Sequence, residues 1–104
     1  MALKQVTEAD WEQEVLGQPG RVLVDFYAQW CPPCRALTPL LERFAEQHAG
    51  SVAIVKVDTD RDQALAERYG VRTIPTLISF KGGQEVTRAI NPQSRSRLEE
   101  LIAD

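Results

Sequence analysis

Residues 22–34 read VLVDFYAQWCPPC, an apolar run that leads directly into the only two cysteines of the 104-residue chain. An almost unbroken apolar run of this length is typical of a β-strand whose two faces are both covered. The stretch from Cys34 to His48 then carries apolar residues at helical spacing, which predicts a helix. The two cysteines therefore lie where a buried strand gives way to a helix.

The spacing of Cys31 and Cys34 predicts a redox pair. Residues three apart on one helical turn are neighbours with Cα atoms about 5–6 Å apart, which is within the range of a disulfide. Cys31 falls at the start of the helix, where unpaired N–H groups and the positive end of the helix dipole favour a thiolate. We therefore expect Cys31 to be the nucleophile and the more exposed thiol, and Cys34 to be the resolving thiol.

Three segments resemble the thioredoxin family, in the same order along the chain. Trp30-Cys31-Pro32-Pro33-Cys34 follows Val24-Asp25-Phe26-Tyr27-Ala28, Ile74-Pro75-Thr76 is similar to the family's cis-proline loop, and Phe80-Lys81-Gly82-Gly83 resembles its final hairpin. The resemblance covers roughly residues 3 to 103. It implies an α/β thioredoxin fold, with a central mixed sheet of about five strands flanked by about four helices. We expect a single domain over residues 1–104.

The pattern along the chain fits this architecture. We expect strands at residues 3–6, 21–28, 52–57, 76–80 and 85–90, and helices at residues 7–16, 34–48, 60–69 and 94–102. Pro39 should kink the second of these helices, because it removes the hydrogen bond to the carbonyl of Arg35.

The composition is that of an ordinary soluble protein, with 43% hydrophobic and 26% charged residues and a net charge of −3. No run of five basic residues occurs, so a nucleic-acid partner is not expected. No stretch approaches the length of a membrane span, and residues 1–5 lack the apolar core of a signal peptide. We expect a cytoplasmic monomer, although a chain from which a signal peptide had been removed would read the same.

Asp25 interrupts the apolar run and shares one face of the strand with Leu23 and Tyr27. Burying a carboxylate costs several kcal/mol unless its pKa rises or it is paired. The residues alone also allow an edge position with access to water. The resemblance implies that Asp25 lies behind Cys34 and accepts its proton, with Lys56 nearby. For Lys56 a solvated position on its strand is the alternative.

The resemblance also implies an apolar surface that binds substrates around the two cysteines. The residues we expect to form it are Trp30, Pro32, Pro33, Ile74, Pro75 and Asn91. From the residues alone, Trp30 would also suit the core, and a trans Ile74–Pro75 bond would be the default.

Three positions depart from the family pattern. Pro32 stands where the family usually has Gly, Tyr27 where it commonly has Trp, and Asn91-Pro92 where it commonly has Gly-Ala. We expect the redox chemistry to survive all three departures, and partner choice and reduction potential to respond to them.

The function we expect is the reduction of protein disulfides by dithiol–disulfide exchange. Electrons would come from a thioredoxin reductase-type donor, and no bound cofactor is needed beyond the redox-active disulfide. A net oxidase or isomerase, a binding module without turnover and a pair of inert thiols are the alternatives.

Zinc needs four ligands, and Cys31, Cys34 and the single histidine, His48, could supply a site only between two molecules, so we expect no metal.

Overall fold

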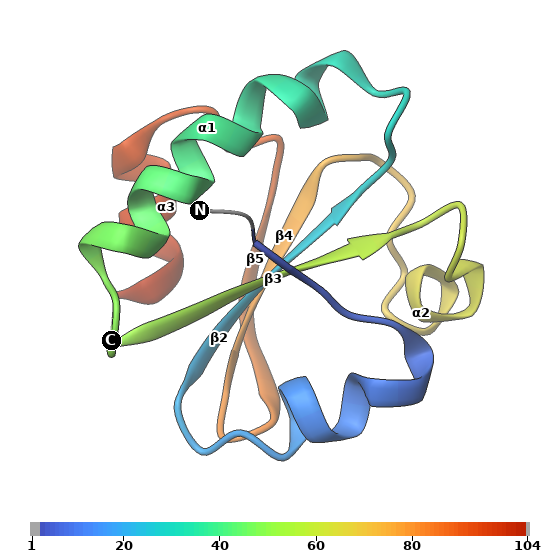
Figure 1. Cartoon of the computed structure of the whole chain (residues 1–104), viewed down its shortest axis with the longest axis horizontal. Coiled ribbons are helices and arrows are strands. Elements are labelled where there is room, and N and C mark those ends of the chain that lie inside the picture. The colour runs from blue at the N-terminus through green and yellow to red at the C-terminus, as the bar shows by residue number, and fades with distance from the viewer. Residues whose placement is uncertain (1–2, 104) are drawn as a thin grey trace.

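A five-stranded mixed sheet lies at the centre of the computed structural model, which describes residues 3–103 of the chain (Figure 1). Its strands are β1 (Lys4–Gln5), β2 (Arg21–Tyr27), β3 (Val52–Asp58), β4 (Thr76–Lys81) and β5 (Gln84–Ile90). They are ordered β1-β3-β2-β4-β5, with β1, β3 and β2 parallel and β4 antiparallel to both of its neighbours. This arrangement confirms the expected α/β fold and its mixed sheet.

Helices cover both faces of this sheet. They are η1 (Glu8–Asp10), η2 (Glu12–Leu16), α1 (Pro32–Gln47), α2 (Gln63–Arg68) and α3 (Arg95–Ile102). Figure 1 shows α1 and α3 on one side of the sheet, and α2 with the blue N-terminal helices on the other. Each side has its own core: Leu37 and Leu98 belong to the cluster under α1 and α3, whereas Trp11 and Leu65 belong to the opposite one.

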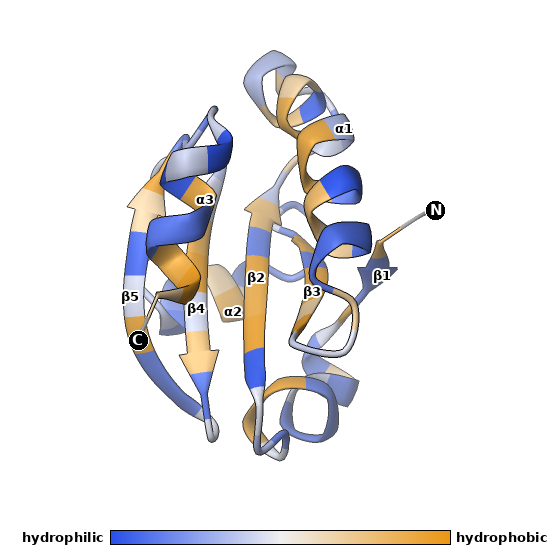
Figure 2. Ribbon diagram, turned by 90° about the vertical axis from the view of Figure 1, so that its left-hand side faces the viewer, coloured by the Kyte–Doolittle hydropathy of each residue, from blue (hydrophilic) through white to orange (hydrophobic). Residues whose placement is uncertain are grey.

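Strand β2 is the central element, because it lies between β3 and β4 and every one of its residues is buried. Leu23 packs into the core under α1, whereas Val22, Val24 and Phe26 pack into the core on the other face. The strand is coloured as hydrophobic along most of its length in Figure 2. Coverage of both faces explains why its sequence is almost continuously apolar instead of alternating.

The segment at residues 7–16 differs from the single helix that the sequence predicts. A 3₁₀ turn, η1, is followed by a π-helical stretch, η2, in which the Gly17 N–H reaches the Glu12 carbonyl at 2.6 Å. Trp11 and Val15 are both fully buried, and the Trp11 indole N–H donates to the Tyr69 hydroxyl at 3.0 Å. Packing of these two side chains against the sheet thus overrides the regular α-helical pattern.

The hairpin between β4 and β5 turns at Gly82 and Gly83, whose φ angles are +60° and +80°. Positive φ at both positions is typical of a type I′ two-residue turn, and glycine adopts it without strain. At Gly83 a side chain is also excluded by space, since a Cβ atom there would come within 2.3 Å of the Leu16 carbonyl oxygen. This contact fixes the hairpin against the end of η2.

Candidate active site

The two cysteines lie where the carboxyl end of β2 leads into α1 (Figure 1). Cys31 and Cys34 form a disulfide with their Cα atoms 5.2 Å apart. Helix α1 begins at Pro32, two residues before the predicted start, with Cys31 as its N-cap. Proline is well suited to the first turn, since its missing N–H would have no intrahelical partner.

The Cys34 backbone N–H points at the Cys31 sulfur, with 3.3 Å between nitrogen and sulfur. Pro32 and Pro33 have no N–H, so Cys34 supplies the first backbone donor of the helix. A donor at this position, together with the helix dipole, stabilises negative charge on the sulfur that it faces. The geometry therefore favours a thiolate at Cys31.

In this disulfide form both cysteines are almost fully buried, so the expected greater exposure of Cys31 stays a prediction for the reduced protein. Cys31 is 3% exposed and Cys34 is 2% exposed. Both pack in one small cluster with Tyr27, Ala28 and Ile74, and the Cys31 sulfur lies 3.9 Å from the Ile74 carbonyl oxygen. The difference between the two sulfurs in this state therefore lies in hydrogen bonding at the helix start, and not in exposure.

The loop before β4 forms one wall beside the disulfide. The Ile74–Pro75 peptide bond is cis, as the resemblance implied. Pro75 is buried and Ile74 half-buried, and the Pro75 carbonyl accepts a hydrogen bond of 2.8 Å from the Asn91 backbone N–H. This bond joins the proline loop to the segment that follows β5.

Trp30 stands on the surface next to Cys31 and is 66% exposed, so it is not a core residue. Its indole N–H donates to an oxygen of Asp60 at 2.8 Å. A large exposed apolar side chain that is held in place by a polar contact is well suited to contact another protein.

Asp25 is 1% exposed and sits mid-strand in β2, which excludes an edge position. It faces Lys56 of β3 and Leu77 of β4 in the sheet register, and neither carboxyl oxygen has a hydrogen-bond partner among residues 3–103. Burial raises the pKa of Asp25 to about 7, and the charge of Lys56 offsets only part of this rise. The carboxyl group therefore exchanges its proton near neutral pH.

Lys56 lies close to this carboxyl group while keeping a contact with Tyr27. Its Nζ is 4.1 Å from the centre of the Tyr27 ring, and the Tyr27 hydroxyl donates to Gln5 at 2.8 Å. Lys56, Tyr27 and Cys34 share the lining of a cavity of about 310 Å³, which is large enough to hold water. Cys34 therefore borders a cavity that has room for water.

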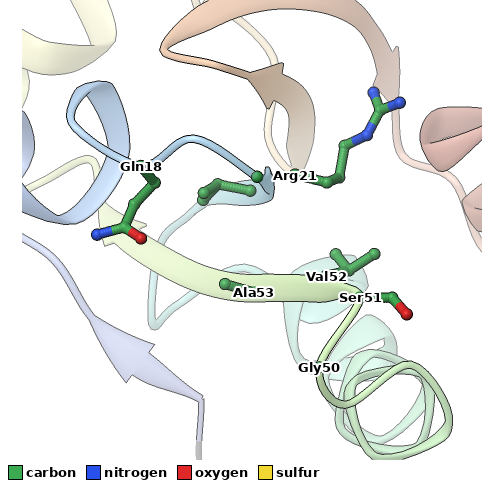
Figure 3. A pocket seen from close by; sticks show the side chains of 8 residues that line it. Gln18, Arg21, Gly50, Ser51, Val52 and Ala53 are labelled. Carbon is green, nitrogen blue, oxygen red and sulfur yellow. The ribbon is translucent and has the colours of Figure 1, made fainter.

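A second pocket, of about 240 Å³, lies at the opposite end of the parallel strands (Figure 3). Its lining includes Gln18, Arg21, Ser51 and Val52 and contains no residue that the sequence predicts for the site.

Among residues 3–103, no group of three or more His, Cys, Asp or Glu side chains is placed to hold a metal ion. The two sulfur atoms of Cys31 and Cys34 form the redox-active pair of this site.

Comparison with known proteins agrees with this geometry. The family model for thioredoxin matches residues 2–104. The chain is 43% identical over 101 residues to thioredoxin 1 of Nostoc sp., covering 97% of this chain and 94% of that protein. It is 42% identical over 102 residues to the thioredoxin of Porphyra purpurea, covering 98% of this chain and 95% of that protein. The chain belongs to the thioredoxin family.

A thioredoxin of Staphylococcus aureus is also similar, with 41% identity over 102 residues, or 98% of this chain and 96% of that protein. Together with the Cys31–Cys34 disulfide, these relatives identify a thiol–disulfide oxidoreductase, a disulfide reductase of the thioredoxin type. No helix within residues 3–103 is both long and apolar enough to cross a membrane.

The departures from the thioredoxin pattern occupy different environments. Pro32 is exposed at the first position of α1, and Asn91 is exposed with a φ of +49°. Pro92, in contrast, is buried, so its ring does not project onto the surface beside the disulfide. Of these two residues, only Asn91 has a side chain that can narrow this surface.

Sequence reasoning missed one residue of this region. The Gln93 side-chain N–H₂ group donates to the Pro33 carbonyl at 3.0 Å and to the Asn91 side-chain oxygen at 2.5 Å. An exposed glutamine after a strand carries no local signal of such a role, because its two partners lie in different segments of the chain.

Proposed function

We propose that this thioredoxin reduces disulfides of other proteins through Cys31 as nucleophile and Cys34 as resolving thiol. The Cys31 thiolate attacks one sulfur of a substrate disulfide, forming a mixed disulfide and releasing the other substrate sulfur as a thiolate. Cys34 then loses its proton and attacks the Cys31 sulfur, which releases the second substrate thiolate and leaves the Cys31–Cys34 disulfide. The observation that carries this assignment is the Cys34 N–H directed at the Cys31 sulfur.

In the second step Asp25 is the proposed acceptor of the Cys34 proton. A general base is most effective when its pKa lies near the working pH, and burial brings the pKa of Asp25 to about 7. The cavity that borders Cys34 and Lys56 has room for water beside the Cys34 thiol.

The proposed substrate-binding surface surrounds the disulfide. Its residues are Trp30, Pro32, Pro33, Ile74, Pro75 and Asn91. The exposed Trp30 and the half-buried Ile74, which the buried Pro75 holds in place, provide apolar contacts, and the rings of Pro32 and Pro33 are exposed as well.

The proposed partners are a thioredoxin reductase-type electron donor and protein disulfides, with the chain acting as a single-domain monomer without a bound cofactor. We place it in the cytoplasm, because a disulfide reductase needs a compartment that keeps thiols reduced. Met1, Ala2 and Asp104 of the proposed domain lie outside the described residues.

The experiment is single-turnover reduction of insulin by the pre-reduced protein, with Cys31→Ser and Cys34→Ser compared to the wild type. We expect Cys31→Ser to lose reduction and Cys34→Ser to accumulate a mixed disulfide through Cys31, visible by mass spectrometry. Reduction that survives in Cys31→Ser would overturn the assignment. A binding module would keep its partner in the variant with both serines, and a net oxidase would transfer its disulfide to reduced insulin faster than it reduces the oxidised form.

A further inference from the structure

Gln93 connects two segments that border the disulfide. It lies after β5, whereas its acceptor Pro33 is 60 positions earlier, in the first turn of α1 next to Cys34. A side-chain amide nitrogen carries two hydrogens, and here one reaches the Pro33 carbonyl and the other the Asn91 side-chain oxygen. Both donors of Gln93 are therefore used on residues of the proposed binding surface.

Asn91 is held by two hydrogen bonds and has an uncommon backbone conformation. Its backbone occupies the left-handed region, its N–H donates to the Pro75 carbonyl, and its side-chain oxygen accepts from Gln93. With the oxygen engaged, the orientation of the amide is set, and its N–H₂ group is directed to the other side. No residue among 3–103 accepts a hydrogen bond from that group, and Asn91 is exposed.

The Asn91 amide differs chemically from the surface around it. Pro32, Pro33, Ile74 and Pro75 have no side-chain hydrogen-bond donor. A docked partner that buries the Asn91 N–H₂ group without supplying an acceptor would leave a desolvated donor unpaired, which weakens binding. A partner that supplies an oxygen there forms a bond whose donor is already oriented, so little side-chain entropy is lost.

We propose that Gln93 is a positioning residue that presents the Asn91 amide as a hydrogen-bond donor on the docking surface. The chain then prefers substrate disulfides whose flanking segment brings a side-chain carbonyl or carboxylate oxygen to Asn91. This inference rests on the proposed function, because it assigns a substrate class to the same surface.

The test is a set of matched peptide disulfides. Each carries Asn, Asp or Leu at one of the two positions before or after the reactive cysteine, and all else is constant. The measured quantity is the ratio of kcat/KM for the Asn or Asp peptide to that for the Leu peptide. We expect a ratio of about three to ten at one position for the wild type, which is the range of one neutral hydrogen bond.

Three variants examine whether the preference depends on the proposed contacts. Gln93→Leu keeps the size of the side chain without its donors, and Asn91→Gly removes the amide itself. We expect the ratio to fall close to one in each, with no further change in the double variant. Gln47→Leu, the same substitution at the exposed far end of α1, is the matched control and should keep the wild-type ratio.

A wild type without preference at any position would overturn the proposal, as would a ratio that Gln93→Leu leaves unchanged. Additive effects in the double variant would show that Gln93 does not act through Asn91, and a fall in Gln47→Leu would show a nonspecific effect. Because the ratio compares two substrates of one variant, general loss of redox activity cancels. Failure of the wild type to reduce any peptide would instead count against the proposed function.

Discussion

Asp25 of β2 and Lys56 of β3 occupy directly opposite positions in the sheet, yet the lysine offsets only part of the effect of burial on the carboxyl group. The Lys56 ammonium lies over the Tyr27 ring, and neither Asp25 oxygen has a hydrogen-bond partner among residues 3–103. Asp25 is therefore a destabilising residue when it is ionised, which is the state that accepts a proton from Cys34.

We expect Asp25→Ala to stabilise the fold above pH 7. Because the folded-state pKa of about 7 lies above the ordinary value of 3.8, Asp25 destabilises the wild type least below pH 4, and its destabilising contribution grows as the pH rises to 7. The advantage of the variant in unfolding free energy should grow by about 1.4 kcal/mol per pH unit over that range and then level off. Urea unfolding of the oxidised proteins at several pH values measures this difference.

The same substitution should slow disulfide reduction near pH 7, because Cys34 loses its proton acceptor. An unchanged rate combined with lower stability would show that Asp25 is a paired structural residue. Lys56→Met provides the control, since it keeps the carboxyl group and removes the cation that lowers its pKa. Because the pKa of Asp25 is then higher, we expect the Lys56→Met variant to go on losing unfolding free energy above pH 7.

In the reduced protein we expect Cys31 to react with iodoacetamide before Cys34. The Cys34 N–H and the start of α1 stabilise a thiolate at Cys31, whereas no hydrogen-bond donor within residues 3–103 is directed at the Cys34 sulfur. Brief alkylation near neutral pH followed by mass mapping identifies the labelled residue. Preferential labelling of Cys34 would reverse the assigned roles, and equal labelling would show that the helix start does not separate the two thiols.

Asn91→Gly should improve turnover with a thioredoxin reductase taken from another organism. Asn91 stands where the family commonly has glycine. Its φ is +49°, which glycine adopts without strain. We expect KM for the reductase to fall severalfold, measured by NADPH consumption. Pro92→Ala should bring no gain and should lower the melting temperature, because Pro92 is buried. Equal KM values for the wild type and Asn91→Gly would show that this loop does not limit docking.

Pro32→Gly should make the reduction potential modestly less negative. The glycine restores an N–H to the first turn of α1, which stabilises the Cys31 thiolate and thus the reduced form. It also frees the reduced loop, and this entropic effect is at most about 20 mV. Equilibration with glutathione buffers measures the shift. A more negative potential would show that the proline distorts the ring more than it restricts the reduced loop.

The features that sequence reasoning predicted best depend on local patterns. The apolar run of β2, the cysteine spacing and the Gly82-Gly83 turn each point to one backbone conformation, and the structure has all three. Asp25 was predictable as well, because a charged residue within a doubly covered strand requires a special environment.

The features that were missed or wrong depend on contacts between distant segments. Cys31 is buried in part by Ile74, which lies 43 positions away in the loop before β4. The π-helical turn at Glu12–Leu16 follows from the packing of Trp11 against Tyr69. Gln93 acts on Pro33, 60 residues away, and no periodicity in the sequence records such a contact.

The two tryptophans of the chain lie in opposite environments, and this separates two optical signals. Trp11 is 1% exposed within a ring cluster of Phe26, Tyr69 and Phe80, whereas Trp30 is 66% exposed beside the disulfide. The fluorescence of Trp11 should therefore follow unfolding of the core, and that of Trp30 should follow the oxidation state and the arrival of a partner. A Trp30→Phe variant would report folding alone, so the chain carries built-in probes for stability and for docking that can be read independently.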